Sequence, residues 1–263
     1  MVFTTELAVK KVNNFVTDAI NLKSYNLSES DKIIVMYSKD KGLIKGVAKG
    51  VKKPKSKLGA RMDLLVANKL MLYKGKNLDR ICQADVLNTF NKTRRDMDKI
   101  FYSMYISEVV NNFGVEDDPC SEEIYTLLYK ALNKISEAET KEEILIAVIK
   151  FQLKMMQISG LGIEFDTCLC CREPIENENM YFSTNMGGVI CEHCNETLHN
   201  KTHMHYKIRD FLNALVQFDF DYKSDYEEKA TEKVCMVCFE LLKEYINRHS
   251  SKKFNSTNIL QEV

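Results

Sequence analysis

Cysteines at metal-binding spacing are the residues of this 263-residue sequence that most directly suggest chemistry. Four of the nine cysteines form two Cys-x-x-Cys pairs with nineteen residues between them. This spacing is typical of a tetrahedral zinc site with four thiolate ligands, and such a zinc is structural because no coordination position remains for water. We therefore expect one structural Zn²⁺ per chain, bound by Cys168, Cys171, Cys191 and Cys194.

The surroundings of these pairs leave two alternatives open and predict one turn. Cys170 lies inside the first pair and His193 inside the second, so either side chain could replace a neighbouring ligand. Gly187 and Gly188 precede the second pair and predict a hairpin turn there, because glycine tolerates the backbone angles of tight turns. The paired spacing and the odd number of cysteines favour a reducing compartment over a disulfide framework.

Further cysteines and histidines have simpler interpretations. Cys235 and Cys238 lie on or beside the apolar stripe of an expected helix, so we expect them in the core, where unpaired cysteines are common. A polar loop leading into a helix explains a histidine cluster better than a metal site does. That cluster consists of His199, His203 and His205.

Positive charge is concentrated in the first third of a chain whose formal net charge is zero. Residues 1–80 contain seventeen Lys and Arg and seven Asp and Glu. Within them, residues 39–61 contain nine cations and a single acid, Asp40. Such a surface would neutralise phosphates and bind nucleic acid in a salt-dependent manner. The nine cations are Lys39, Lys41, Lys45, Lys49, Lys52, Lys53, Lys55, Lys57 and Arg61.

Three tyrosines accompany this charge. Tyr25, Tyr37 and Tyr73 could stack on the bases of a single strand, although each is explained more simply as a core or rim residue.

The expected secondary structure that positions these residues changes from strands to helices near residue 90. Before it, alternating apolar residues and glycine-rich turns predict five short strands, the number in a small OB-fold barrel. The expected strands lie near Phe15–Leu22 and at Ile33–Ser38, Leu43–Lys49, Leu64–Tyr73 and Leu78–Leu87.

After residue 90 the apolar residues recur with helical spacing. Thr93 with Asp96, and Thr140 with Glu143, are arranged as capping boxes, and Ser121 is placed to cap a helix between them. The expected helices run from Thr93 to about Asn112, from Ser121, from Thr140 to before Gly160, from about Met204 to Phe218 and from about Tyr226 to Arg248.

Several classes of protein are not supported. The sequence has no P-loop, no G-x-G-x-x-G, no H-E-x-x-H and no carboxylate cluster for two magnesium ions, so we expect no catalytic centre. No apolar run approaches the roughly 20 residues of a membrane span, and the N-terminus lacks the pattern of a signal peptide. We expect a soluble, cytoplasmic protein with neither a membrane nor a small-molecule substrate as its partner.

Two stretches resemble one known family. YNLSESDKIIVMYSKDKGLIKGVAKGVKKPKSKLGARMDLLVANKLMLYKGKNLDRICQAD, at Tyr25–Asp85, is similar to the N-terminal domain of the bacterial RecO family of recombination mediators. CLCC…YFSTNMGGVICEHC resembles the zinc module of that family. The resemblance covers nearly the whole chain, with basic block, helices and cysteine pairs in the family's order.

The resemblance implies an α+β protein, in which an N-terminal OB-fold β-barrel is followed by an all-α domain with an inserted four-cysteine zinc module. The expected boundaries are 1–85 for the barrel (with a lead-in at 1–12), 86–250 for the helical domain, about 165–200 for the zinc module and 251–263 for a frayed tail. Two departures from the family stand out. Residues 160–166 lack its Gly-Tyr and proline, and Arg172 replaces its usual glycine, which predicts backbone strain.

The function implied is non-enzymatic. The family binds single- and double-stranded DNA, anneals complementary strands, and with RecR helps load recombinase onto strands coated by single-strand-binding protein, whose C-terminal tail it contacts. Lys207 and Arg209 are candidates for holding that acidic tail. The implied setting is DNA repair on the nucleoid. Two alternatives are an adaptor whose basic charge is incidental and a zinc-dependent enzyme acting on nucleic acid.

Overall fold

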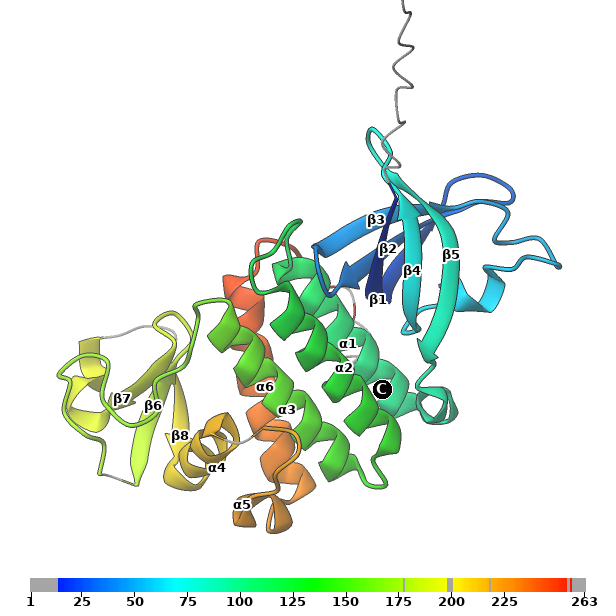
Figure 1. The fold of residues 1–263 in the computed structure, drawn as a ribbon. Coiled ribbons are helices and arrows are strands. Elements are labelled where there is room, and N and C mark those ends of the chain that lie inside the picture. Colours follow the sequence, from blue (N-terminus) through cyan, green and yellow to red (C-terminus); the bar gives the residue numbers. More distant parts are fainter. Residues whose placement is uncertain (1–13, 177, 198–200, 218, 255, 257–263) are drawn as a thin grey trace, which may run out of the picture.

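The first part of the chain closes into a barrel. The computed structural model describes residues 14–176, 178–197, 201–217, 219–254 and 256, so the expected lead-in at 1–12 and most of the expected tail lie outside the described residues (Figure 1). The barrel order is β1-β2-β3-β5-β4, with β3 and β5 parallel and the other neighbouring strands antiparallel. This is the OB-fold arrangement that the sequence predicted. The strands are β1 (Asn14–Asn26), β2 (Lys32–Ser38), β3 (Gly42–Ala48), β4 (Ala67–Tyr73) and β5 (Asp79–Asn88).

Alternation along the strands builds the barrel interior. In β3 every second residue is buried, including Ile44 and Ala48, while Lys45 between them is exposed. A Cβ atom at Gly46 would lie 2.8 Å from the Ile81 side chain, so glycine allows β3 and β5 to approach closely. A register shift between Asn21 and Lys23 bends β1, which pairs with β2 on one side and β4 on the other.

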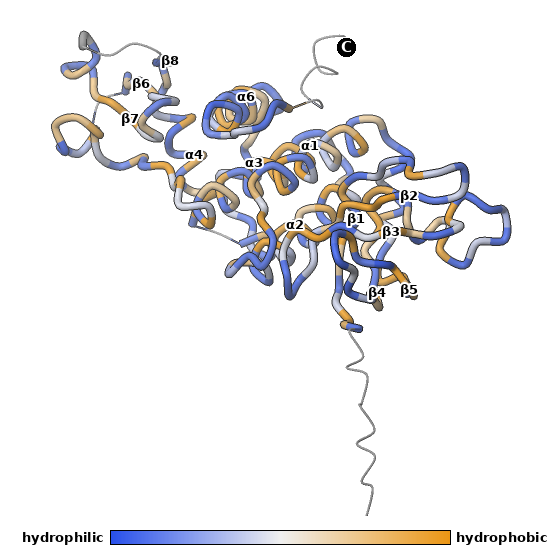
Figure 2. Tube along the Cα trace, turned by 90° about the horizontal axis from the view of Figure 1, so that it is seen from above, coloured by the Kyte–Doolittle hydropathy of each residue, from blue (hydrophilic) through white to orange (hydrophobic). Residues whose placement is uncertain are grey.

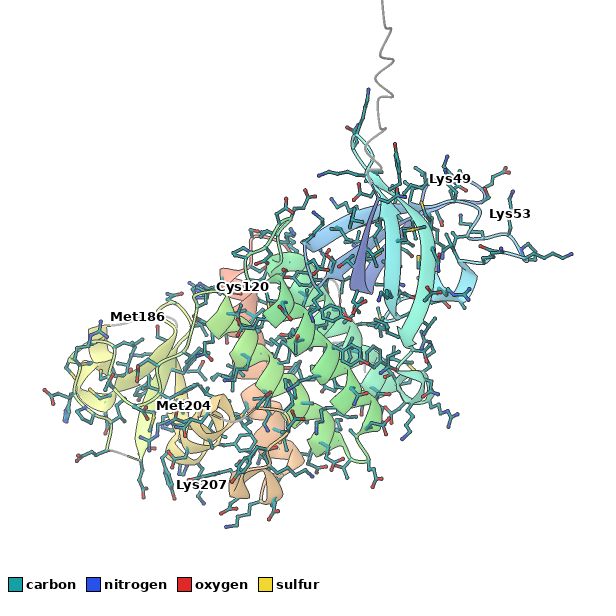
Figure 3. The ribbon with its side chains drawn as sticks, in the orientation of Figure 1. Lys49, Lys53, Cys120, Met186, Met204 and Lys207 are labelled. Carbon is teal, nitrogen blue, oxygen red and sulfur yellow. The ribbon has the colours of Figure 1, made fainter. Side chains whose placement is uncertain are left out.

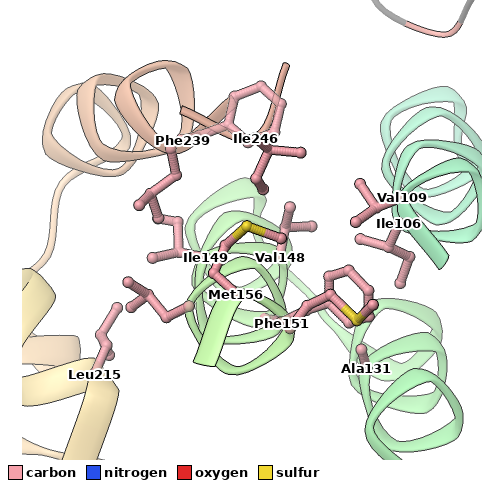
Figure 4. Packing of buried hydrophobic residues seen from close by; sticks show 14 of the residues in the cluster. Ile106, Val109, Ala131, Val148, Ile149, Phe151, Met156, Leu215, Phe239 and Ile246 are labelled. Carbon is pink, nitrogen blue, oxygen red and sulfur yellow. The ribbon is translucent and has the colours of Figure 1, made fainter. Parts of the chain in front are cut away.

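The helical domain is organised around one central helix. It contains α1 (Met97–Phe113), α2 (Ser121–Glu137), α3 (Lys141–Ile158), α4 (Tyr206–Gln217), α5 (Asp225–Glu228) and α6 (Glu232–His249). Two thirds of α3 is buried, as expected for a helix covered on nearly all sides. Figure 4 shows α3 between α6, which contributes Phe239 and Ile246, and the pair α1 and α2.

Helix starts agree with the sequence at one position and differ at two. Thr140 caps α3 as predicted, since its hydroxyl accepts from the Glu143 N–H at 3.3 Å. Thr93 instead lies buried in a 3₁₀ turn, η2 (Asn91–Arg95), and Asp96 caps α1 by accepting from the Lys99 N–H at 3.0 Å. Ser121 is the first residue of α2 rather than its cap, because the preceding turn is formed by Asp118, whose carbonyl accepts from the Ser121 N–H.

The second half of the chain corrects two further predictions. Met204 does not begin a helix but lies buried in strand β8 (Lys201–His205), opposite Met180. The expected last helix is divided into α5 and α6, with the side chain of Thr231 capping α6. Phe218 and His199 lie outside the described residues. A three-stranded sheet, β7-β6-β8, contains β6 (Asn179–Ser183) and β7 (Gly188–Cys191) in addition to β8.

The barrel and the helical domain are joined at the turn between β2 and β3. The Leu43 N–H donates to the Val115 carbonyl and the Asp117 N–H to the Lys41 carbonyl, both at 2.8 Å. Tyr37 is fully buried at this junction and donates from its hydroxyl to Asp118 at 3.0 Å. Burial and the adjacent Asp118 charge raise the pKa of Tyr37, so the phenol stays protonated as a donor. Tyr37 is therefore a core residue.

The three parts lie in a row, with the helices between the barrel and the small sheet (Figures 1 and 2). In Figure 2, α6 is seen nearly end-on with hydrophobic and hydrophilic residues alternating around its turns. Within the described ranges, no helix is long and apolar enough to cross a membrane.

Candidate metal centre and nucleic-acid interface

The four predicted metal ligands are brought together. The sulfur atoms of Cys168, Cys171, Cys191 and Cys194 all lie within 4.8 Å of one another, and the Cys171 and Cys191 sulfurs are 3.9 Å apart. A tetrahedron with Zn–S bonds of about 2.3 Å has edges of about 3.8 Å. The four cysteines are therefore close enough to hold a metal ion.

Backbone hydrogen bonds shape the two cysteine pairs. The first pair forms a tight turn in which the Arg172 N–H donates to the Cys168 carbonyl at 2.9 Å. The second pair spans the end of β7 and the 3₁₀ turn η3 (Glu192–Thr197). Gly187, in the left-handed region at φ +74°, makes the predicted turn between β6 and β7. Its N–H donates to the Ser183 carbonyl at 2.9 Å.

Arg172 bears the backbone strain that its position predicted. Its φ is +67°, a conformation that costs an ordinary L-residue about 1–2 kcal/mol relative to glycine. With the turn in this conformation, both sulfurs of the first pair lie within 4.8 Å of those of the second pair.

Hydrogen bonds within the cluster shift the pKa values of two of its thiols in opposite directions. Burial alone raises the pKa of the Cys168 thiol, but the backbone N–H groups of Cys171, Cys191 and Cys170 stabilise its thiolate and bring the pKa down to about 6. One of these bonds runs from the Cys191 N–H to the Cys168 sulfur at 3.3 Å. The hydrogen bond with Cys191, together with burial, raises the pKa of Cys194 to about 12. Four sulfur atoms at these distances form an S₄ donor set, which suits zinc or iron.

The neighbouring candidates lie outside the group of four mutually close sulfurs. Cys170 is exposed, and neither its sulfur nor the His193 ring belongs to the group of four. Cys235 and Cys238 are fully buried on α6, which confirms their prediction as core residues. His203 and His205 lie on strand β8, so the prediction of a polar loop there was wrong.

The nine predicted DNA-binding cations occupy separate parts of the barrel. Lys39 and Lys41 lie in the turn between β2 and β3, beside the helical domain. There the Lys39 ammonium is 3.0 Å from a Glu122 oxygen, and the Lys41 ammonium is 3.9 Å from an Asp117 oxygen. These two lysines therefore contribute to the junction, while Lys45 is exposed on the outer face of β3.

The other six cations share one connection, which we call the basic loop (residues 49–61). The loop begins at the end of β3 and leads into the 3₁₀ turn η1 (Gly59–Met62). All six side chains are exposed, and none of them forms an ion pair within the described part of the chain. Figure 3 shows Lys49 and Lys53 at the end of the barrel that faces away from the helices.

Hydrogen bonds anchor both ends of the basic loop. At its start, the Gly50 N–H donates to the Asp31 carboxylate at 2.7 Å, which lowers the pKa of Asp31. Lys52 donates to the Ser28 carbonyl at 3.0 Å. At its end, the buried amides of Asn21 and Asn68 both donate to the Arg61 carbonyl at 2.8 Å. Both ends of the basic loop are thus held against the barrel by hydrogen bonds.

Two lysines that the charge count did not single out lie beside Lys45. A cleft of about 190 Å³ is lined by Lys41 and Lys45 and by Lys74 and Lys76 of the turn between β4 and β5. Carboxylates line it too, among them Asp117. OB-folds bind oligonucleotides with this loop and the adjacent strands, so the fold itself was the signal that could have indicated Lys74 and Lys76.

Comparisons with known proteins agree with this arrangement. The family model described as "Recombination protein O N terminal" matches residues 12–90, and "Recombination protein O C terminal" matches residues 94–258. Among curated relatives, "DNA repair protein RecO" of Desulforamulus reducens is 28% identical over 251 residues, covering 94% of this chain and 93% of the relative. The protein of the same name from Acetivibrio thermocellus is 30% identical over 185 residues, covering 70% and 72%.

Proposed function

The chain belongs to the RecO family of DNA repair proteins, and we propose that it is a non-enzymatic recombination mediator that binds single- and double-stranded DNA through its barrel. One observation carries the proposal. The basic loop presents six exposed cations without ion-pair partners among the described residues, at the free end of an OB-fold barrel. Such a surface is complementary to a phosphate backbone and contains no feature that selects a base sequence.

Annealing follows from this charge without a catalytic group. Two complementary strands repel each other, and a cationic surface that holds both of them lowers the repulsion, while base pairing supplies the free energy. The proposal includes the partners that the family resemblance implies, RecR and the acidic tail of single-strand-binding protein, and a location on the nucleoid in the cytoplasm.

We further propose that the metal is a single structural Zn²⁺ held by the four clustered thiolates. Four sulfur ligands leave no position at which zinc could activate water, which favours a mediator over a zinc-dependent enzyme. The ion would join the turn that precedes β6 to the end of β7 and the start of η3, and its role would be structural only.

The test is single-strand affinity as a function of salt. In the variant Lys53/Lys55/Lys57→Glu, which spares the Lys52 anchor, three phosphate contacts are lost. Because each contact contributes about 0.7 to the slope of log affinity against log salt, that slope should decrease by about 2, and annealing should fall with it. Fluorescence anisotropy of a labelled oligonucleotide measures the slope.

A matched control keeps the change in net charge and moves it elsewhere. Lys229 and Lys233 are exposed lysines of the helical domain and Lys253 is an exposed lysine that follows it, and their triple Glu variant should retain the wild-type slope. If both triple variants keep the wild-type slope and anneal normally, the barrel is not the DNA surface and the adaptor alternative is favoured.

A further inference from the structure

One face of the small sheet of the zinc module carries aromatic and basic side chains that do not belong to the cysteine cluster. Met180 of β6 and Met204 of β8 are buried on the inner side of the sheet and lie opposite each other. Side chains alternate along a strand, so Tyr181 of β6 and Lys201, His203 and His205 of β8 point to the other side of the sheet, where both histidines are exposed. We call this outward surface and its continuation into α4 the aromatic face; it consists of Tyr181, Lys201, His203, His205, Tyr206 and Lys207.

Rings and cations are in contact at one end of this face. Tyr181 and His203 are paired across the two strands, with ring centroids 5.6 Å apart and planes at 82°. The Lys201 ammonium lies 5.3 Å from the Tyr181 ring centroid, and the Asn179 side-chain oxygen is 3.2 Å from His203 Nε2. These contacts hold the rings in defined orientations.

The same alternation continues at the other end. His205 lies two residues beyond His203, about 7 Å along the strand, and its ring is 4.5 Å from that of Tyr206 with the planes tilted by 35°. The Lys207 ammonium is 6.0 Å from the Tyr206 ring centroid. Aromatic rings and lysine ammonium groups thus lie next to one another along β8 and at the start of α4.

Charge complementarity selects the ligand. The three strands read NMYFS, GVIC and KTHMH, so no carboxylate belongs to the sheet. Acids flank the sheet at its ends, where Glu178 precedes β6 and Glu192 follows β7, while Asp210 is paired with Arg209 at 2.7 Å. Aromatic rings beside cations are the combination with which proteins bind single strands, because unpaired bases stack on rings and phosphates contact the cations. In a duplex the base faces are covered by neighbouring bases.

We propose that the aromatic face is a second binding surface for single-stranded DNA. Lys207 and the basic loop residue Lys53 lie at opposite ends of the molecule in Figure 3, so one chain would hold strand segments at two separated places. The inference rests on the proposed function, since it extends DNA binding from the barrel to the zinc module.

The direct test is photo-crosslinking of the full chain. A single-stranded oligonucleotide containing 5-iodouracil is irradiated with the protein, and the crosslinked peptides are identified by mass spectrometry. We expect crosslinks at Tyr181, His203 or Tyr206 in addition to any on the barrel. Crosslinks confined to the barrel would overturn the proposal.

Variants supply the energetic test. Loss of one base stack should weaken single-strand binding about fivefold or more in Tyr181→Ala and in His203→Ala, whereas Tyr181→Phe keeps the ring and should restore binding. Thr202→Ala is the matched control, because Thr202 is exposed on the same strand and points to the opposite side. Metal content shows whether each variant has folded. His203 is exposed, so if Tyr181→Ala does not fold, His203→Ala alone tests whether the aromatic face binds single strands.

The outcomes separate this inference from the proposed function. If Lys53/Lys55/Lys57→Glu loses the salt slope while His203→Ala binds as Thr202→Ala does, the barrel binds DNA and the aromatic face does not. If His203→Ala weakens binding and the basic loop variant keeps the wild-type slope, the aromatic face is the DNA surface. Binding of an acidic peptide that survives when oligonucleotide binding is absent would assign the face to a protein and contradict the proposal.

Discussion

At the scale of single residues, ligand identity at the cysteine cluster is decided by where each sulfur points. The paired spacing favoured Cys168 and Cys171 as ligands, but Cys170 lies between them and was left open as a substitute for either. The tight turn, closed through the strained Arg172, directs Cys168 and Cys171 toward the second pair and leaves Cys170 exposed outside the group. Backbone geometry therefore distinguishes residues that spacing alone does not.

This geometry predicts different consequences for neighbouring substitutions. Cys171→Ser should lose the bound metal on dialysis and destabilise the zinc module, because structural zinc contributes on the order of 10–16 kcal/mol to folding. Cys170→Ser should retain one metal per chain and an unchanged unfolding transition. Metal analysis and thermal unfolding monitored by circular dichroism measure both. Equal loss of metal from the two variants would show that the assigned group of four is wrong.

At the scale of elements, a buried lysine fastens the segment around α5 to α3. Lys150 is 3% exposed, and its ammonium lies 2.8 Å from a Glu227 oxygen and 2.9 Å from the Tyr222 carbonyl. Glu227 also accepts from the Ser224 N–H at 3.0 Å. A buried charge of this kind holds its partners in place because neither ion can return to water without unfolding the segment.

Removing one partner should cost more than removing both charges. Lys150→Met leaves the Glu227 carboxylate buried and unpaired, so we expect a loss of about 3–5 kcal/mol in the free energy of unfolding. The double variant Lys150→Met/Glu227→Gln should lose less, because the amide oxygen still accepts from Ser224 and no charge stays buried. Urea unfolding measures this cycle. A double variant less stable than Lys150→Met would contradict the proposed role of the pair.

At the scale of the whole molecule, glycine lets the barrel meet the helices. Gly42 has φ +64°, and a Cβ atom there would lie 2.4 Å from the Val115 carbonyl oxygen and 2.6 Å from the Asp118 Cβ. A side chain at this position would therefore separate the turn between β2 and β3 from the segment that follows α1. The two backbone hydrogen bonds of the junction depend on that approach.

Gly42→Ala should weaken the coupling between barrel and helical domain. We expect a loss of more than about 2 kcal/mol, from the positive φ together with the backbone clash, and a broadened or divided unfolding transition in calorimetry. Gly59→Ala is the control, because nothing lies within 4 Å of its added Cβ, and it should unfold as the wild type does. A single wild-type transition in Gly42→Ala would mean that the junction does not couple the two parts.

The sequence by itself determined the features that depend on local order. Apolar alternation marked the five strands of the barrel, helical spacing marked most helices, and the paired cysteines identified the cluster. The charge count located the basic loop, because its six cations are close together in one connection. Each of these signals is contained within a short window of the chain, so the residues carry it without knowledge of their distant neighbours.

Only the tertiary structure decided which distant residues share a surface. Packing of the barrel against α2 places Lys39 beside Glu122 and away from the basic loop, whereas closure of the barrel places Lys74 and Lys76 beside Lys45. His203 faces Tyr181 because β8 pairs with β6 across more than twenty residues of chain. Pairing of this kind is selected by the burial of both strands together, a free energy that no local window of sequence contains.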